Sequence, residues 1–230
     1  MADKNIDNKV VRDFGKEWQA FNHKDIDQSL LDSAFDSYFH IFPFDDLSNA
    51  IGFDMGCGSG RWAKFVAPRV KFLNCIDPSQ SALDQAKLNL NNFKNCSFEC
   101  NGVDGNTLDD NSQDFGYSLG VLHHIPDTLL ALEACSTKLK SGAPFLLYLY
   151  YRFDNKPKGY YFLWKISDLL RRVISKLPFV MKFFISQLIA LIIYLPLSRF
   201  ALLAEKLGTD VTNFSLTWYR NESFYILRTD

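Results

Sequence analysis

The sequence lacks an excess of basic residues, a zinc-type cysteine spacing and an apolar leader at its start. It has 25 Lys and Arg and 26 Asp and Glu, a formal net charge of −1, which argues against a protein that coats nucleic acid. The five cysteines are odd in number and fit no zinc spacing. The first 15 residues contain no signal-peptide core. We therefore expect a cytoplasmic chain with reduced thiols, no metal and no nucleic-acid partner.

No internal repeat or low-complexity linker interrupts the chain. Residues 8–47 are expected to be helical, and between residues 48 and 151 short apolar runs alternate with amphipathic stretches. Apolar strands separated by helices of about ten residues are typical of βαβ units. They predict an α/β fold, a doubly wound and mainly parallel sheet covered on both faces. The expected strands are 50–55, 69–77, 96–103, 114–122 and 144–151, and the expected helices are 60–67, 79–90 (capped by Ser79) and 127–139.

The composition changes after residue 151, which indicates a separate segment. Residues 151–208 contain ten Lys and Arg against three Asp and Glu, a local charge of +7, so the rest of the chain carries −8. Apolar residues between 166 and 177 follow the spacing of one helix face. We expect four parts: an N-terminal helical cap (1–47), an α/β core (48–151), a basic, apolar helical insertion (152–208) and a C-terminal segment (209–230).

A glycine-rich loop follows the first predicted strand, with the sequence DMGCGSG at residues 54–60. Glycines between a strand and a helix let a ligand approach the main chain. A dinucleotide site has the pattern G-x-G-x-x-G, in which a pyrophosphate lies on the helix N-terminus. Here Arg61 stands where that third glycine would be, and Asp54 precedes the loop, where it favours a cationic ligand. The spacing therefore argues against a nicotinamide-dependent oxidoreductase.

These residues resemble the class I S-adenosylmethionine-dependent methyltransferases, whose first motif is an acid, any residue, and G-x-G-x-G. The resemblance continues through Asp77 in CIDPS, Asp104 in GVDGNTL and the loop SLGVLHHIPD at 118–127, so it spans roughly residues 48–151. It implies a Rossmann-like methyltransferase fold and S-adenosyl-L-methionine as cofactor. It also implies that Asp77 accepts the ribose hydroxyls and that Asp104 meets the adenine amino group.

The cofactor-binding residues that we expect lie in these four motifs. The three acids also have a simpler interpretation: Asp54 as a hydrogen-bonding partner of its own turn, Asp77 as a strand-end turn residue and Asp104 as part of a plain turn. The full predicted set is Asp54, Gly56, Cys57, Gly58, Gly60, Asp77, Asp104, Gly105 and Leu119.

His123 and His124 follow the fourth predicted strand and are the candidate catalytic residues. A base is needed only if the acceptor loses a proton as it attacks the methyl group, and histidine titrates near neutral pH. The resemblance leaves an alternative, in which the first histidine packs beside the cofactor. The pair lacks further ligands for a metal.

The sequence predicts a methyltransferase acting on a small or lipid-like acceptor. The segment FGKEWQAF (14–21) loosely resembles substrate-binding heads of family members; alternatively Phe14, Trp18 and Phe21 face the core of an amphipathic helix. The other functions left open are a membrane-associated interaction module, a catalytically inactive homologue and, less favoured, the oxidoreductase.

Residues 160–207 are expected to be helical and either to cover the substrate site or to contact the inner face of a membrane peripherally. The longest uncharged run, 183–198, has 16 residues and contains Ser186, Gln187 and Pro196, whereas a spanning helix needs about 20. Only 223–228 in the last 22 residues is predicted to be a strand. Because the family closes its sheet with more elements, we expect the chain to be a fragment.

Overall fold

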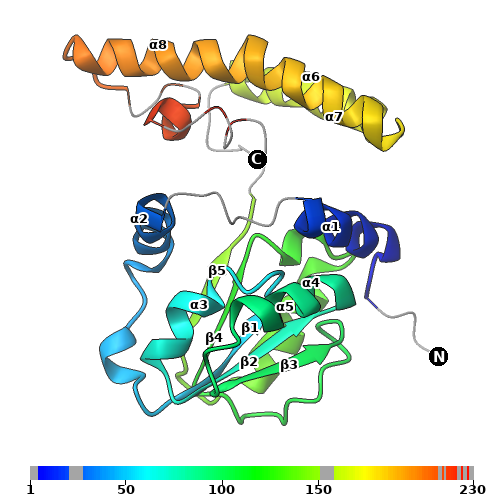
Figure 1. The fold of residues 1–230 in the computed structure, drawn as a ribbon, viewed down its shortest axis with the longest axis vertical. Coiled ribbons are helices and arrows are strands. Elements are labelled where there is room, and N and C mark those ends of the chain that lie inside the picture. Colours follow the sequence, from blue (N-terminus) through cyan, green and yellow to red (C-terminus); the bar gives the residue numbers. More distant parts are fainter. Residues whose placement is uncertain are drawn as a thin grey trace. The chain divides into compact units, whose positions relative to one another are not determined.

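The computed structural model describes residues 5–20, 28–150, 158–211, 214, 216–221, 224 and 227. The chain divides into two compact units, Met1–Tyr150 and Tyr151–Asp230. The first contains the sheet and the second contains long helices (Figure 1). Each unit is described by itself below.

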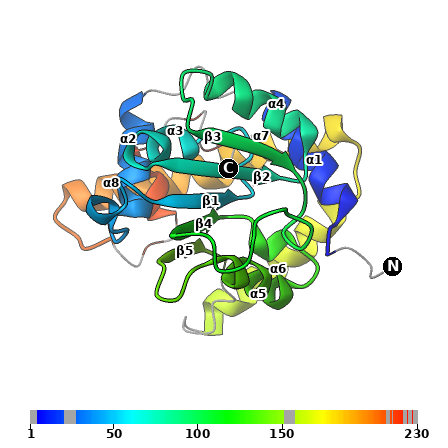
Figure 2. The ribbon, with the colours of Figure 1, turned by 90° about the horizontal axis from the view of Figure 1, so that it is seen from below.

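The sheet of the first unit has five parallel strands in the order β3-β2-β1-β4-β5 (Figure 2). This arrangement confirms the prediction of a doubly wound sheet. Strand β1 is central, and the chain crosses to either side of it, so β1 and β4 mark the point where the strand order reverses. The strands are β1 (Ile51–Met55), β2 (Phe72–Asp77), β3 (Cys96–Cys100), β4 (Phe115–Leu119) and β5 (Phe145–Tyr148).

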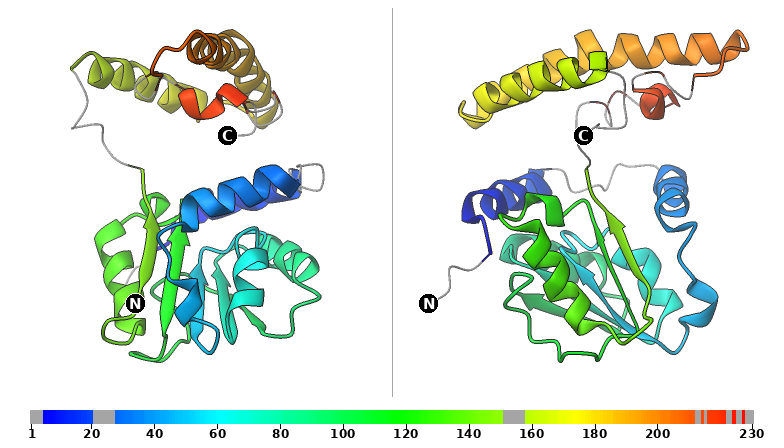
Figure 3. Two further views of the ribbon diagram at one scale, coloured as in Figure 1. Left: turned by 90° about the vertical axis from the view of Figure 1, so that its left-hand side faces the viewer. Right: turned by 180° about the vertical axis from the view of Figure 1, so that it is seen from behind.

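Helices cover both faces of this sheet (Figure 3, left). One core contains side chains of α3 (Ala63–Val66) and α4 (Gln80–Asn89), and the other contains side chains of α5 (Thr128–Lys138). Caps fix the helix starts: the Ser79 hydroxyl accepts a hydrogen bond from the Ala82 amide, as predicted, and Asp127 caps α5.

Several elements are shorter than the sequence predicts. Strands β3, β4 and β5 end at Cys100, Leu119 and Tyr148. Strand β3 ends opposite Asp77, the last residue of β2, and β4 ends before Gly120, whose φ of +75° is not a strand conformation. A 3₁₀ turn, η3 (Leu122–His124), takes the place of the predicted end of the fourth strand. Helix α3 gives way to a second 3₁₀ turn, η2 (Ala67–Arg69), where Pro68 cannot donate a helical hydrogen bond.

The N-terminal elements contribute aromatic rings to the core of the first unit. They are α1 (Asn8–Ala20), α2 (Gln28–Phe39) and the 3₁₀ turn η1 (Phe44–Asp46). Phe35 and Phe39 are buried, and the ring of Phe35 stacks on Phe39 at 4.4 Å and on Phe65 at 4.8 Å. Stacked aromatic pairs add to the energy of apolar burial, so α2 is anchored to the sheet layer.

Strands β1 and β4 pack through two reciprocal glycine–phenylalanine pairs. Gly52 lies opposite Phe115 and Phe53 opposite Gly116 in the register. A Cβ atom on Gly52 would lie 2.4 Å from the Phe115 ring, and one on Gly116 would lie 2.4 Å from the Phe53 ring. Each glycine therefore leaves the space that the ring on the neighbouring strand fills.

The second unit is built on long helices: α6 (Lys158–Ile174), α7 (Phe179–Ile189) and α8 (Leu195–Lys206). A π-helical turn, η4 (Ala190–Tyr194), joins α7 to α8, which lets the helix continue past Pro196 despite its missing N–H. The 3₁₀ turn η5 (Thr217–Asn221) packs against α8.

The predicted strand at 223–228 is wrong at the two positions that the structure describes. Phe224 and Leu227 are helical. A strand needs a neighbour for its ladder, and the described residues of the second unit contain no strand that could pair with this segment. The other residues of 223–228 lie outside the described part of the chain.

We expect Gly116→Ala to destabilise the first unit by about 1–3 kcal/mol, because the new methyl group overlaps the Phe53 ring. Urea unfolding measures this change. Gly159→Ala is the control, since nothing lies within 4 Å of its added Cβ, and it should leave stability unchanged or slightly raised. Adding Phe53→Leu to Gly116→Ala should restore part of the lost stability. Equal free energies of unfolding for Gly116→Ala and the control Gly159→Ala would contradict the packing argument.

Candidate functional site

The predicted site residues come together because the strands are parallel. Their carboxyl ends lie at one edge of the sheet, which carries the glycine loop after β1, Asp77 at the end of β2 and segment 102–105 after β3. Leu119 at the end of β4 and residues 120–124 after it contribute to the same edge. In open α/β sheets this edge, at the point where strand order reverses, is where ligands bind.

The glycine loop is required in part by packing within the protein itself. Gly56, with φ of +80°, would place a Cβ 2.4 Å from a Val121 methyl group, and Gly60, with φ of +76°, would place one 2.9 Å from Leu90. Both positions are therefore closed to larger residues by backbone conformation and by contact. The loop is held close to the segment after β4 and to α4.

Asp77 holds the glycine loop and the start of α4. Its Oδ2 accepts a hydrogen bond of 2.9 Å from the Gly58 amide, and its Oδ1 accepts one of 2.8 Å from the Ser79 amide. Burial raises the pKa of Asp77, and these amides oppose the rise. Each carboxylate oxygen has two lone pairs, so Asp77 retains the capacity to accept hydrogen bonds from a ligand.

Asp54 is a buried carboxyl group with an unused oxygen. It lies on β1 beside Tyr117 of β4 in the register, and its Oδ2 has no hydrogen-bond partner among the described residues. Burial raises the pKa of Asp54 to about 8; the Tyr117 hydroxyl opposes this rise and the Asp77 charge adds to it. An unpaired buried carboxylate is costly, so a cation placed here would gain a strong partner.

Cys57 lies buried inside the loop as a neutral thiol. The Cys75 thiol lowers its pKa, while burial and the charges of Asp54 and Asp77 raise it, to about 11 as the net result. The residues that the structure describes contain no cluster of His, Cys, Asp or Glu arranged to hold a metal ion. The role of Cys57 in cofactor binding stays a prediction.

Asp104 is tied to the N-terminal segment, a contact that the sequence did not indicate. The backbone amide of Asn5 donates a hydrogen bond of 3.2 Å to Asp104 Oδ2. The Asn5 side chain donates one hydrogen bond to the Asp127 carbonyl and accepts one from the Asp127 amide. A Cβ on Gly102 would lie 2.5 Å from Ile6. These partners are about a hundred residues apart in sequence, and no local pattern indicates them.

Gly105, which follows β3, and Leu119, the last residue of β4, complete the set of predicted cofactor-binding residues. Gly105 is exposed, and its carbonyl accepts a hydrogen bond from the Asn101 side chain. Leu119 is half-buried at the end of β4, opposite Tyr148. Their contact with a cofactor stays a prediction.

His123 and His124 lie in η3 among aromatic rings. The His123 ring is 4.2 Å from Tyr150 and 4.1 Å from His124, and both of its nitrogens are buried without a hydrogen-bond partner among the described residues. Burial and then the charge of His124 lower the pKa of His123 to about 4, and burial lowers that of His124. His123 is therefore neutral at pH 7 and a weak base.

Helix α1 reaches the same region through Phe14, whose ring meets His124 edge-on at 5.0 Å. Phe14 is half-buried and contacts the loop after β4, and its expected place in the core stays a prediction. The side chain of Trp18 and all of Phe21 lie outside the described part of the chain. Tyr150 and Phe14 thus contact the two histidines. The sequence did not indicate these contacts, because the residues lie in different segments of the chain.

Residues 53–147 match a protein family described as "Methyltransferase domain". Ubiquinone biosynthesis O-methyltransferase from Coxiella burnetii is 27% identical over 122 residues, which cover 46% of this chain and 52% of that protein. This chain therefore spans about half the length of the curated relatives that it matches.

Solved structures with a similar fold include two methyltransferases. Phosphoethanolamine N-methyltransferase 1 from Haemonchus contortus is 19% identical with a TM-score of 0.48, covering 59% of this chain and 31% of that one. An S-adenosylmethionine-dependent methyltransferase from Mesorhizobium loti is 22% identical with a TM-score of 0.46, covering 51% and 54%.

We expect Asp54→Asn to stabilise the protein increasingly as pH rises from about 4 to about 8. The folded state holds the Asp54 proton up to about pH 8, whereas the unfolded chain releases it near 3.8, so ionisation of the unfolded chain costs the native protein stability across this window. Urea unfolding at several pH values measures the difference. Asp84→Asn, at an exposed acid of α4, is the control; parallel profiles for the two variants would contradict the raised pKa.

Proposed function

Because its α/β core belongs to the class I S-adenosylmethionine-dependent methyltransferase family, we propose that this protein transfers a methyl group from S-adenosylmethionine to a lipid-like acceptor. The observation that carries the proposal is the convergence of the glycine loop with Asp54 and Asp77 at the carboxyl edge of the parallel sheet. The family match also disfavours the oxidoreductase alternative.

The residues of this edge fit the chemical groups of the cofactor. Asp77 has lone pairs left to accept the ribose hydroxyls, and the orphaned Oδ2 of Asp54 suits the ammonium group of the methionine part. Asp104, oriented by Asn5, would meet the adenine amino group. A bound ammonium would favour the ionised form of Asp54 and so lower its pKa.

The cofactor supplies a methyl group that its sulfonium already activates, so the protein's main contribution is alignment. Holding donor and acceptor in line is worth up to about 7–11 kcal/mol in well-oriented systems. The aromatic group of His123, His124, Tyr150 and Phe14 offers apolar surfaces against which an acceptor ring or chain can be positioned.

We further propose an oxygen acceptor on a lipid-like molecule. The Coxiella burnetii relative is named a ubiquinone biosynthesis O-methyltransferase, and the aromatic residues near η3 suit an apolar substrate. A hydroxyl must lose its proton as it attacks, and His123 is neutral and available to accept it, although its low pKa makes it a weak base.

We expect Asp77→Ala to weaken S-adenosylmethionine binding at least tenfold, because the ribose hydroxyls lose an ionised acceptor worth about 1.5–3 kcal/mol. Isothermal titration with S-adenosylmethionine and S-adenosylhomocysteine measures the affinity. Since Asp77 also holds Gly58 and Ser79, circular dichroism must show that the variant is folded. Asp84→Ala is the matched control, and unchanged affinity in folded Asp77→Ala would refute the site.

We expect His123→Asn to lower kcat of methyl transfer by about 10²–10⁴-fold if His123 is the base, with cofactor affinity unchanged. Transfer of tritiated methyl groups into a membrane-lipid extract measures the activity. His40→Asn, at an exposed histidine that follows α2, is the control. An unchanged kcat would show that solvent or another group accepts the proton, and that His123 has a packing role.

A further inference from the structure

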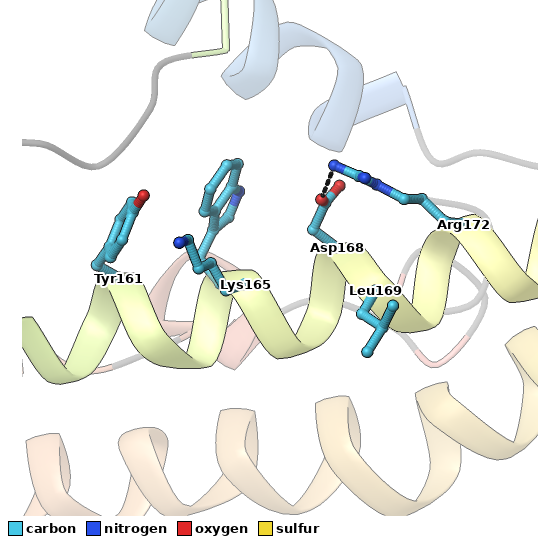
Figure 4. A pocket seen from close by; sticks show the side chains of 6 residues that line it. Tyr161, Lys165, Asp168, Leu169 and Arg172 are labelled. Carbon is cyan, nitrogen blue, oxygen red and sulfur yellow. Dashed lines mark hydrogen bonds and ion pairs between the residues drawn. The ribbon is translucent and has the colours of Figure 1, made fainter.

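The apolar face of α6 is exposed. Phe162, Ile166, Leu169, Leu170 and Val173 recur at the spacing of one helix face, and their exposed fractions lie between 43% and 65%. Figure 4 shows Leu169 pointing away from the side of α6 that carries its polar residues. Those residues are Tyr161, Lys165, Asp168 and Arg172.

The continuous helix that α7, η4 and α8 form presents a second apolar surface. Met181–Lys206 is long and apolar enough to cross a membrane by length and composition, with a mean hydropathy of 1.8 and only 17% of its most apolar window buried. Its exposed large side chains include Phe184, Leu188, Leu191, Ile192, Phe200 and Leu203. Their exposed fractions lie between 52% and 66%, and large exposed apolar patches are rare on soluble monomers.

Basic residues accompany both apolar surfaces. Residues 158–206 contain eight Lys and Arg against two Asp and Glu, a net charge of +6. Lys165, Arg171, Lys176 and Lys182 are all exposed or only partly buried. An apolar surface bordered by positive charge complements an anionic bilayer, where each basic residue near the surface contributes about 1 kcal/mol.

We propose that α6 and the helix Met181–Lys206 lie in the interface of an anionic lipid bilayer, parallel to its surface. Helix α6 carries Lys165, Asp168 and Arg172 along one side, so it can bury only its other face in lipid. This membrane docking does not depend on the proposed methyl transfer. Taken together, the two proposals make the membrane the source of the lipid-like acceptor.

The polar contacts at the end of the long helix favour this orientation over a spanning one. Its uncharged run of 16 residues covers about 24 Å at 1.5 Å per residue, short of the hydrocarbon thickness of about 30 Å. Beyond it, Arg199 donates a hydrogen bond to the Arg220 carbonyl, and Arg220 forms an ion pair with Glu205 at 2.8 Å. These groups belong in the polar headgroup region.

Flotation of the full chain with phosphatidylcholine vesicles, with and without phosphatidylglycerol, tests the proposal. We expect co-flotation with the anionic vesicles and its loss at high salt, which screens charge. Leu169→Gln with Leu188→Gln should reduce partitioning about tenfold or more. Each of Lys176→Gln and Lys182→Gln should reduce it about fivefold. Leu88→Gln, at an equally exposed leucine of α4, should leave it unchanged.

Three results would overturn the proposal. Absence of flotation with a monomeric chain would assign the apolar faces to burial within the protein. If the protein does not float and forms a dimer that Leu169→Gln dissociates, the apolar faces are covered by a second copy of the chain. Flotation that persists after alkaline extraction, with the ends of the long helix accessible to protease on opposite sides of the bilayer, would show a spanning helix. Unchanged S-adenosylmethionine binding in the glutamine variants keeps this test separate from that of methyl transfer.

Discussion

The Asp77 carboxylate is the point on which the arrangement of the site depends. Through hydrogen bonds to the Gly58 and Ser79 amides it connects the end of β2 to the loop after β1 and to the start of α4. A carboxylate that accepts two backbone amides is strongly oriented. The loop is thereby fixed before any ligand binds, which lowers the conformational cost of binding.

Asp54 adds a different constraint, since it lies buried in the sheet with an oxygen that no described residue satisfies. Such a group costs stability in the free protein and gains most when a cation arrives. Natural proteins tolerate this cost mainly at functional sites. The cost that Asp54 places on the core is therefore also the basis of the cofactor site proposed above.

The two units follow different physical rules. The first unit buries Phe53, Phe115 and Tyr117 completely. The backbone amides and carbonyls of its strands form hydrogen bonds with neighbouring parallel strands. The second leaves large apolar side chains in contact with solvent along α6 and the helix that follows. An external apolar environment that covered these side chains would stabilise the second unit by removing their surface from water.

The sequence by itself determined the sheet, the glycine loop and the helix capped by Ser79, because these depend on local signals: apolar periodicity, glycine spacing and the Ser79 hydroxyl. The end of β3, by contrast, depended on where its neighbour β2 stops. The partnership of Asn5 with Asp104, the raised pKa of Asp54 and the contact of His123 with Tyr150 were decided only by the tertiary structure. They arise between residues far apart in the chain, where burial and packing, rather than local sequence, set the chemistry.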